Sequence, residues 1–302
     1  METTETSGQT TDAPIRGWGP GPDLIDSPER MIDVVRHFGI IPFFKGAVPG
    51  WSIEEMTAPG CWFDDGPDSV ILGPWDWKID VVREGDIAYG KFLGGKAAFA
   101  TVEWYRELMN WRRSQPRYQM ALGKPFKAVS TTDKLMKHLS PHVLEIIRVQ
   151  GAVETGQLRS LCREAVTPAL LRALPARYKT LLSPSVKKNI MDSIIQFLQS
   201  GTWIIIGDFE RVYRGQDLHY NGWQRASNTT PEALFASVAA DSSKQPFWAK
   251  YLEQPTGGPG TGESGNNSLA VPRTPEESRN LLISHVLDFF PSASPETLKK
   301  LI

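Results

Sequence analysis

The stretch SPHVLEIIRVQGAVETGQLRSLCREA, residues 140–165, carries the pattern on which the predicted fold depends. Its first two residues, serine and proline, predict a helix start, because serine caps helix N-termini and proline fits the first turn. Gly151 ends that helix, Val153 fills the turn, and a second helix opens at Thr155 or Gly156. Two short helices around a tight turn are typical of the first half of a helix-turn-helix.

A third helix and a β-ribbon are predicted downstream. The run SPSVKKNIMDSIIQFLQSG (183–201) has an apolar stripe at helical spacing. The run TWIIIGDFERVYR (202–214) predicts a strand, and Asn221-Gly222 predicts a turn that leads into WQRAS (223–227). Three helices and then a two-stranded ribbon are the order of a winged helix, with any small α+β domain as the alternative.

Composition divides the 302-residue chain into five segments. They are a disordered tail (1–24), an acidic, aromatic-rich α/β module (25–116), a basic winged-helix-like module (117–250), a flexible linker (251–273) and a helical tail (274–302). The predicted fold class is therefore α+β. The run ISHVLDFFPSASPETLKKLI (283–302) matches the first helix pair at an offset of 140 residues, so the tail looks like a truncated helix-turn-helix.

Charge is distributed unevenly along a chain whose net charge is −1. Residues 1–116 contain 11 Lys/Arg and 18 Asp/Glu, net −7, whereas residues 117–227 contain 16 and 8, net +8. Such a basic segment is expected to bind a polyanion such as duplex DNA. An equally good explanation is that it pairs with the acidic segment of the same molecule. The basic side chains expected to contact nucleic acid are Arg172, Arg177, Lys179, Lys187, Lys188, Arg211 and Arg214.

The run GKFLGGKA (90–97) differs by one residue from a phosphate-binding P-loop. Ala97 stands where the P-loop has the hydroxyl that binds Mg²⁺. The pair Gly94-Gly95 predicts a two-residue hairpin instead, because both turn positions favour a positive φ. The next helix is predicted to start only at Thr101, too late for its N-terminus to bind a phosphate at the glycines.

Six tryptophans within 61 residues mark the N-terminal module. An aromatic core is the simpler interpretation. The alternative is a cleft whose rings stack on a base or another flat ligand, built by Trp62, Trp75, Trp77 and Tyr89. Carboxylates near these rings are the candidates for a catalytic role, namely Asp64, Asp65, Asp76 and Asp80.

Several function classes lack their usual signals. The five histidines are scattered, the two cysteines form no C-x-x-C motif, and we expect neither a metal site nor a cofactor. No apolar run is long enough to cross a bilayer, and the polar, acidic N-terminus is unlike a secretory signal. We therefore expect an intracellular protein, in the cytoplasm or the nucleus, without a membrane partner. The sequence does not indicate its oligomeric state.

Three stretches together resemble the AlkZ-related protein family. They are IIPFFKGAVPGWSIEEMTAPGCWF (40–63), GPWDWKIDVVREGDIAYGKFLGGKAAFATVEWYRELMNWRR (73–113), and TWIIIGDFERV with YNGWQRASNTTPEALF (202–235). The family is named for its similarity to AlkZ, a bacterial glycosylase of tandem winged helices that removes alkylated bases and unhooks interstrand crosslinks. The resemblance implies a winged-helix scaffold that binds duplex DNA and is linked to repair of alkylated DNA.

One departure from those glycosylases leaves enzymatic activity open. They carry two catalytic glutamines separated by one residue, and no Gln-x-Gln occurs in this chain, so no catalytic residue can be transferred. An alternative function stays open as well. It is a small-molecule enzyme or accessory protein of specialised metabolism, with the aromatic module as its pocket.

Overall fold

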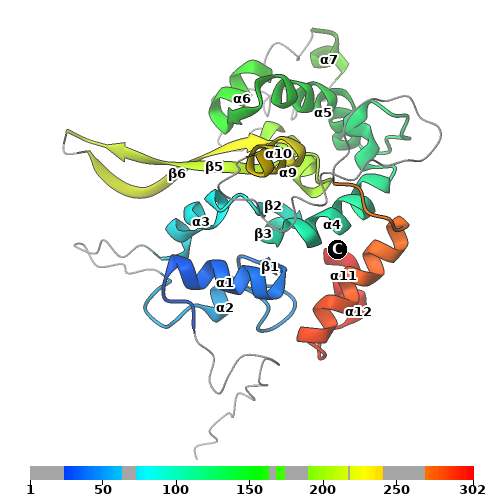
Figure 1. Ribbon diagram of the computed structural model, residues 1–302. Helices are drawn as coiled ribbons and strands as arrows, with labels where there is room; N and C mark the ends of the chain where they lie inside the picture. The colour runs from blue at the N-terminus through cyan, green and yellow to red at the C-terminus, as the bar shows by residue number, and fades with distance from the viewer. Residues whose placement is uncertain (1–23, 63–72, 163–167, 174–189, 217, 241–268) are drawn as a thin grey trace, which may run out of the picture.

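Helices and strands are mixed in the computed structural model, which confirms the predicted α+β class (Figure 1). The structure describes residues 24–62, 73–162, 168–173, 190–216, 218–240 and 269–302. Three parts are named here by their described residues: the first lobe (24–116 and 269–302), the second lobe (117–204) and the arm (205–229). In Figure 1 the first lobe lies below, the second lobe above, and the arm extends to the left.

A single antiparallel sheet connects the two lobes, with strand order β1-β3-β2-β5-β6-β4. Its strands are β1 (Ile40–Pro42), β2 (Ile87–Leu93), β3 (Lys96–Thr101), β4 (Ala152–Glu154), β5 (Ile205–Arg214) and β6 (His219–Thr229). Strand β2 of the first lobe pairs with β5 where Tyr89 meets Ile206. The two modules separated by composition therefore share one sheet.

The glycine pair between β2 and β3 forms the predicted hairpin. Gly94 and Gly95 have φ values of 56° and 75°, a region that side chains with a Cβ rarely adopt. The strands pair on both sides of them. Helix α4 (Val102–Ser114) begins only after its N-cap Thr101, so its N-terminus does not face the glycines. The hairpin is confirmed, and its geometry is not that of a P-loop.

Four helices cover the sheet in the first lobe. They are α1 (Pro28–Phe38), α2 (Ile53–Met56), α3 (Pro74–Arg83) and α4. Many of the lobe's aromatic residues are buried; the indole nitrogen of Trp51, for example, donates to the Ile40 carbonyl at 3.0 Å. Trp77 is also buried in this core. The aromatic-core interpretation therefore holds for these two tryptophans.

Helix α5 (Thr131–Gln150) is longer than predicted, and the predicted helix start at Ser140 is wrong. The helix begins after Ser130, whose side chain forms a capping box with Asp133. Pro141 lies inside the helix, although its missing N–H removes one backbone hydrogen bond. Apolar residues of the helix before the proline are buried in the hydrophobic core of the second lobe, like those after it. This burial favours the longer helix.

The second lobe has its own hydrophobic core and four further described helices. They are the 3₁₀ helix η1 (Tyr118–Leu122), α6 (Thr155–Leu161), α7 (Pro168–Ala173) and α9 (Ile190–Ser200). Gly151 ends α5 and Thr155 opens α6, as predicted. Helix α9 packs against β2 of the first lobe, where Gln199 Oε1 accepts a hydrogen bond from the Lys91 N–H at 3.0 Å.

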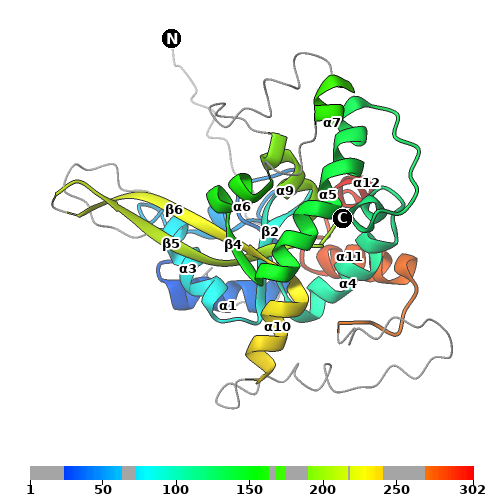
Figure 2. The same cartoon turned by 90° about the horizontal axis from the view of Figure 1, so that it is seen from above.

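The arm is a two-stranded ribbon that projects beyond the lobes (Figures 1 and 2). Its strands pair up to Arg214 and His219, so the predicted turn at Asn221-Gly222 is wrong. Gly222 instead lies within β6, at an irregularity in the pairing, and its φ of 76° accounts for the glycine. After the arm comes α10 (Pro231–Ala240).

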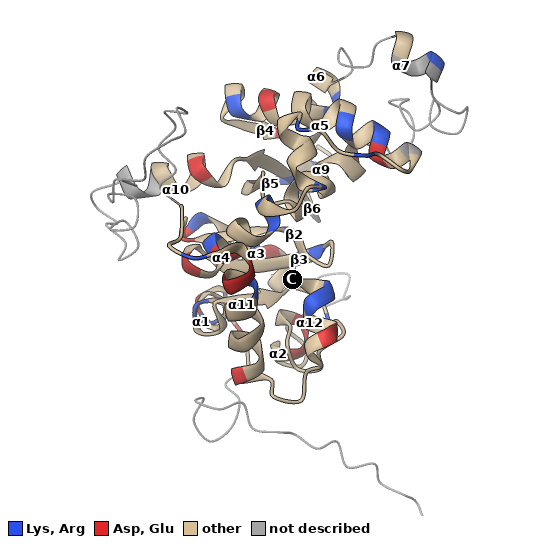
Figure 3. Ribbon diagram, turned by 90° about the vertical axis from the view of Figure 1, so that its right-hand side faces the viewer, with Lys and Arg blue, Asp and Glu red and all other residues tan. Residues whose placement is uncertain are grey.

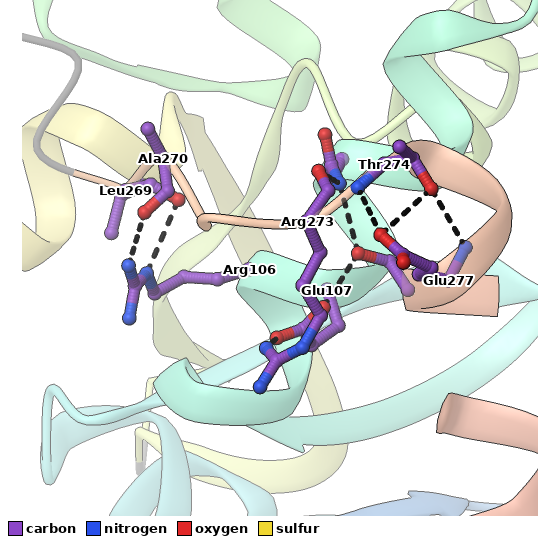
Figure 4. A network of polar contacts seen from close by, with 9 residues as sticks. Arg106, Glu107, Leu269, Ala270, Arg273, Thr274 and Glu277 are labelled. Carbon is purple, nitrogen blue, oxygen red and sulfur yellow. Dashed lines mark hydrogen bonds and ion pairs between the residues drawn. The ribbon is translucent and has the colours of Figure 1, made fainter. Parts of the chain in front are cut away.

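The C-terminal helices α11 (Pro275–Phe289) and α12 (Pro295–Leu301) belong to the core of the first lobe. Figure 4 shows the network that ties residues 269–278, which include the start of α11, to α4. Arg106 donates to the carbonyls of Leu269 and Ala270, and Glu107 accepts from Arg273 and, at 2.6 Å, from Ser278 Oγ. Of the predicted linker, 251–268 lies outside the described residues, and 269–273 runs along α4.

Candidate functional site

A buried polar contact lies where the start of α3 meets the arm. Helix α3 begins at Pro74, after Gly73. A Cβ at Gly73 would lie 2.5 Å from the carbonyl oxygens of Cys61 and Trp62, so only glycine fits there. Six residues around this first turn are called the junction site below: Trp75, Asp76, Lys78, Arg211, Tyr220 and Gln224.

Asp76 is the anion of the junction site and is only 7% exposed. Its Oδ1 accepts from the Tyr220 hydroxyl and, at 2.6 Å, from Gln224 Nε2. The Nε atom of Arg211 lies 4.0 Å from the same oxygen. No hydrogen bond to Oδ2 is found among the described residues. Oδ1 of Asp76 thus binds the arm, whereas Oδ2 can accept a hydrogen bond from another group.

Lys78 is the cation of the site, and its side chain is 1% exposed. Its Nζ donates to the Trp75 carbonyl and lies 3.5 Å from the Trp75 ring centroid and 4.9 Å from that of Phe209. Burial lowers the pKa of Lys78 to about 7; Asp76 partly opposes this shift and Arg211 adds to it. The amine is therefore close to half neutral at pH 7.

The arm contributes the other polar groups of the junction site. The pKa of Tyr220 rises to about 12, mainly because of burial and then because its hydroxyl donates to Asp76. Gln224 Oε1 and Arg211 Nε are buried and lack a hydrogen-bond partner in the described structure. The Gly222 carbonyl, at the irregularity of β6, accepts from Trp75 Nε1 at 2.9 Å. Unmatched donors and acceptors are uncommon in protein interiors and are often associated with function.

The predicted aromatic cleft is only partly open. Trp77 and Tyr89 are buried, and burial raises the pKa of the Tyr89 hydroxyl. Trp62 and Trp75 are half-buried and lie beside the partly exposed ring of Phe44. The rings within reach of a ligand are therefore those next to the junction site, not those of the core.

The candidate carboxylates are spread over different surroundings. Asp76 lies in the junction site, whereas Asp80, one turn later, is half-buried and makes no hydrogen bond with the site's side chains. Asp64 and Asp65 lie outside the described residues. Asp76 is thus the one candidate that the described structure surrounds with polar groups from another segment of the chain.

The predicted nucleic-acid contacts do not form one group. Arg172 on α7 and Arg214 at the end of β5 are exposed, whereas Arg211 lies in the junction site. Four others lie outside the described residues: Arg177, Lys179, Lys187 and Lys188. The described part of the predicted recognition helix, α9, is largely buried between the lobes.

A second set of cations was missed in the sequence. Six exposed side chains lie on and just before α5 and are called the basic face below: Arg117, Lys124, Lys127, Lys134, Lys137 and Arg148. Among them only Arg117 forms an ion pair, at 4.0 Å from Asp133. Figure 3 shows blue segments gathered along this part of the second lobe. Placing the helix start at Ser140 hid the set, because it separated the lysines from Arg148.

The described residues contain neither a cluster of metal ligands nor a membrane-spanning helix. No group of three or more His, Cys, Asp or Glu side chains there is arranged to hold a metal ion. None of the described helices has the length and apolar character of a membrane span. Cys61 and Cys162 are free thiols, and burial raises the pKa of Cys162 to about 11.

Comparison with known proteins gives one match. A family model described as AlkZ related matches residues 25–249, which include the junction site, the basic face and the arm. No curated protein and no solved structure matches the chain.

Proposed function

The chain belongs to the AlkZ-related family, and from this premise we propose that it binds duplex DNA through its second lobe and arm. The observation that carries the proposal is the basic face. Within residues 117–150 the sequence has six Lys/Arg against two Asp/Glu, and all six cations are exposed. Exposed cations with few acidic partners are the electrostatic signature of a phosphate-binding surface.

The dimensions of the basic face suit a nucleic-acid backbone. Lys134 and Arg148 are fourteen positions apart on one helix, about 20 Å at 1.5 Å per residue. Duplex DNA carries one negative charge per ~1.7 Å of its axis, so a helix of this length passes several phosphates. The first lobe, which contains most of the acidic N-terminal segment, would repel the same backbone and so orient the duplex toward the second lobe.

We also infer a winged-helix arrangement for the second lobe and arm. The order of α5, β4, α6, α9, β5 and β6, with the short α7 inserted between α6 and α9, supports it, because a winged helix has three helices, a short strand between the first two, and then a ribbon. In this arrangement the arm is the wing. Its outer part carries exposed Arg214 and Arg225 and the exposed ring of Trp223.

Charge reversal with a matched control tests the proposal. Binding of a labelled duplex of random sequence is measured as a function of salt for the wild type, for Lys134→Glu with Lys137→Glu, and for Lys91→Glu with Lys96→Glu. Both double variants change the net charge equally, and the control lysines are exposed on the first lobe. We expect only the basic-face variant to lose affinity, with a salt slope smaller by about 2. Equal binding by all three proteins, or none at low salt, contradicts the proposal.

The family name also connects the chain with repair of alkylated DNA, and we propose this link at the level of binding. The Gln-x-Gln pair of the glycosylases is absent, so no side chain of this chain is matched to the water that attacks the sugar. We expect no efficient release of N7-alkylguanine. Alkaline cleavage after incubation with a modified duplex measures it; strand breaks at turnover would show that another residue, such as Asp76, positions the water.

A further inference from the structure

The amine of Lys78 is buried with an incomplete set of partners. An ammonium group has three N–H donors, and here one of them is bound, to the Trp75 carbonyl. Lys78 forms no ion pair with a carboxylate of the described residues. The rings of Trp75 and Phe209 take the place of water around the nitrogen. A lysine that serves only to stabilise a fold is normally exposed or paired.

The charged groups around Lys78 favour its neutral form on balance. Arg211, from the arm, disfavours a second positive charge, and Asp76, on the same helix, only partly offsets the loss of hydration. Tyr220, the third titratable neighbour in the junction site, is occupied by its hydrogen bond to Asp76. Desolvation and a neighbouring cation are the two conditions that turn a lysine into a nucleophile at neutral pH.

We propose that Lys78 is a reactive amine that forms an imine with an aldehyde substrate at the junction of α3 and the arm. The nitrogen lone pair of the neutral amine attacks the carbonyl carbon, and the carbonyl oxygen takes up a proton. The resulting carbinolamine loses its hydroxyl as water, which leaves a C=N bond. One aldehyde and one amine give one imine and one water, so the step needs neither an oxidant nor a reductant.

The unmatched atoms of the junction site suit this reaction. Arg211 Nε–H is a buried donor without a hydrogen bond, and it can stabilise negative charge that develops on the carbonyl oxygen. Gln224 Oε1 is a buried acceptor without a donor, and it can take the hydroxyl of the carbinolamine. Both atoms lie around Asp76, whose Oδ2 is likewise without a bond among the described residues.

Access to the amine depends on the arm. Phe209 covers the nitrogen, and the arm is held to α3 by side-chain contacts. They are the bonds of Asp76 to Tyr220 and Gln224, of Trp75 to Gly222 and Gln224, and of Arg83 to Asp208 at 2.9 Å and to the Phe209 carbonyl at 3.2 Å. Opening these contacts exposes Lys78 and also moves Phe209, which belongs to the core of the first lobe.

The aldehyde has two chemical sources. One is a free small molecule, which would make the junction a small-molecule site. The other is the ring-opened deoxyribose of an abasic site in a duplex, whose C1′ is an aldehyde. The amine chemistry is the same for both, so the inference goes beyond DNA binding and does not depend on it.

Reductive trapping tests the inference on the full-length protein. The protein is incubated at pH 7 with cyanoborohydride and either propionaldehyde or a labelled duplex containing one abasic site. Adducts are located by peptide mass spectrometry and denaturing gels. The variants are Lys78→Arg and Lys78→Met, with Lys96→Arg as the matched exposed control, and urea unfolding verifies that each is folded. Binding of the abasic duplex is measured in parallel by gel shift.

We expect Lys78 to be modified at least about tenfold more than any exposed lysine, because an ordinary lysine amine is almost wholly protonated at pH 7. The adduct should be lost in both Lys78 variants and kept in Lys96→Arg. Folded wild type without an adduct at Lys78 from either aldehyde overturns the inference, whether or not the duplex binds. An adduct with propionaldehyde but not with a bound duplex identifies a free carbonyl compound as the substrate. Propionaldehyde labelling without any duplex binding refutes the proposed DNA function and supports this one.

Discussion

Two polar networks join the first lobe to distant parts of the chain, and they differ in how completely their atoms are paired. On α4, both carboxylate oxygens of Glu107 are occupied, one by Arg273 and one by Ser278 (Figure 4). On α3, Lys78 has a single hydrogen bond, and Gln224 Oε1 and Arg211 Nε have none among the described residues. Each network connects segments more than a hundred residues apart, so chain distance does not explain the difference.

The Glu107 network attaches two segments of the chain, whereas the junction site has the features of a reactive site. A buried polar network stabilises an interface when its groups satisfy one another, as those around Glu107 do. The junction site keeps a buried amine and two unmatched atoms, an arrangement that costs stability. Such a cost is expected where a site must bind or react with something that the folded chain does not itself supply.

The largest expected effect is the loss of the paired network on α4. Glu107→Ala leaves Arg273 and the buried Ser278 without their acceptor, so we expect the free energy of unfolding to fall by about 2–3 kcal/mol. The value is at the lower end for buried pairs because the Arg273 side chain is 43% exposed. Urea denaturation measures it.

Glu103→Ala is the matched control for this substitution. Glu103 lies one turn earlier on the same helix and is exposed, so its removal should change stability by no more than about 0.5 kcal/mol. If the two alanine variants are equally stable, the network on α4 does not attach the C-terminal helices, and the contrast between the networks fails.

The second effect concerns pH and the buried amine. Because the folded-state pKa of Lys78 is about 7 against 10.5 as the ordinary value, the unfolded chain binds more protons between these pH values. Stability should therefore rise with pH across that window, by about 2 kcal/mol between pH 7 and 9. Lys78→Met carries no titratable group and should lack this rise in a series of urea unfolding curves.

Lys96→Met serves as the comparison, since it removes an exposed lysine and should keep the pH-dependent rise. The slope, rather than the absolute stability, is the signature, because methionine also loses the bond to the Trp75 carbonyl. A wild type whose stability is flat from pH 7 to 9 would mean that Lys78 is hydrated and unreactive in solution.

The sequence predicted local secondary structure better than it predicted the tertiary contacts between the elements. The glycine hairpin, the helix start at Thr101 and the end of α5 at Gly151 follow from backbone preferences of single residues, and all are confirmed. Two predictions from the same kind of signal are wrong. Pro141 lies within a helix because the stripe of buried residues on both sides outweighs one lost hydrogen bond, and Gly222 gives an irregular strand instead of a turn.

The junction site was only partly accessible from sequence. Asp76 was a candidate because it lies among tryptophans, and Arg211 because it is basic, yet nothing in the sequence brings them together. Their meeting depends on the pairing of β2 with β5, a contact across more than a hundred residues. Lys78 had no motif at all. Its character comes from burial between Trp75 and the arm, which only the three-dimensional structure reveals.

A smaller effect is expected from loosening the arm. Tyr220→Phe removes the hydroxyl that donates to Asp76, so it should lower stability by about 1 kcal/mol. If the arm covers Lys78, the same change should raise the rate of reductive labelling of Lys78 roughly fivefold, the factor that corresponds to 1 kcal/mol. Tyr213→Phe is the control, because Tyr213 lies on the same ribbon and is exposed. Faster labelling in both variants, or in neither, would show that the arm does not control access to the Lys78 amine.

The smallest effect is expected at Lys96, the lysine that a motif search selects. Lys96 follows the two glycines as in a P-loop, but it is exposed at the start of β3. The hairpin lacks both the helix N-terminus and the hydroxyl that phosphate and Mg²⁺ require. Lys96→Ala should therefore change stability by no more than about 0.5 kcal/mol and leave binding of the duplex unchanged. Calorimetry with ATP and Mg²⁺ should give no saturable signal. Saturable binding that disappears in Lys96→Ala would show that Lys96 binds a nucleotide after all. Lys96 matches a sequence motif but is exposed and lacks the surroundings of a P-loop. Lys78 matches no motif but is buried beside Trp75 and Phe209, and this burial is what we expect to make it reactive.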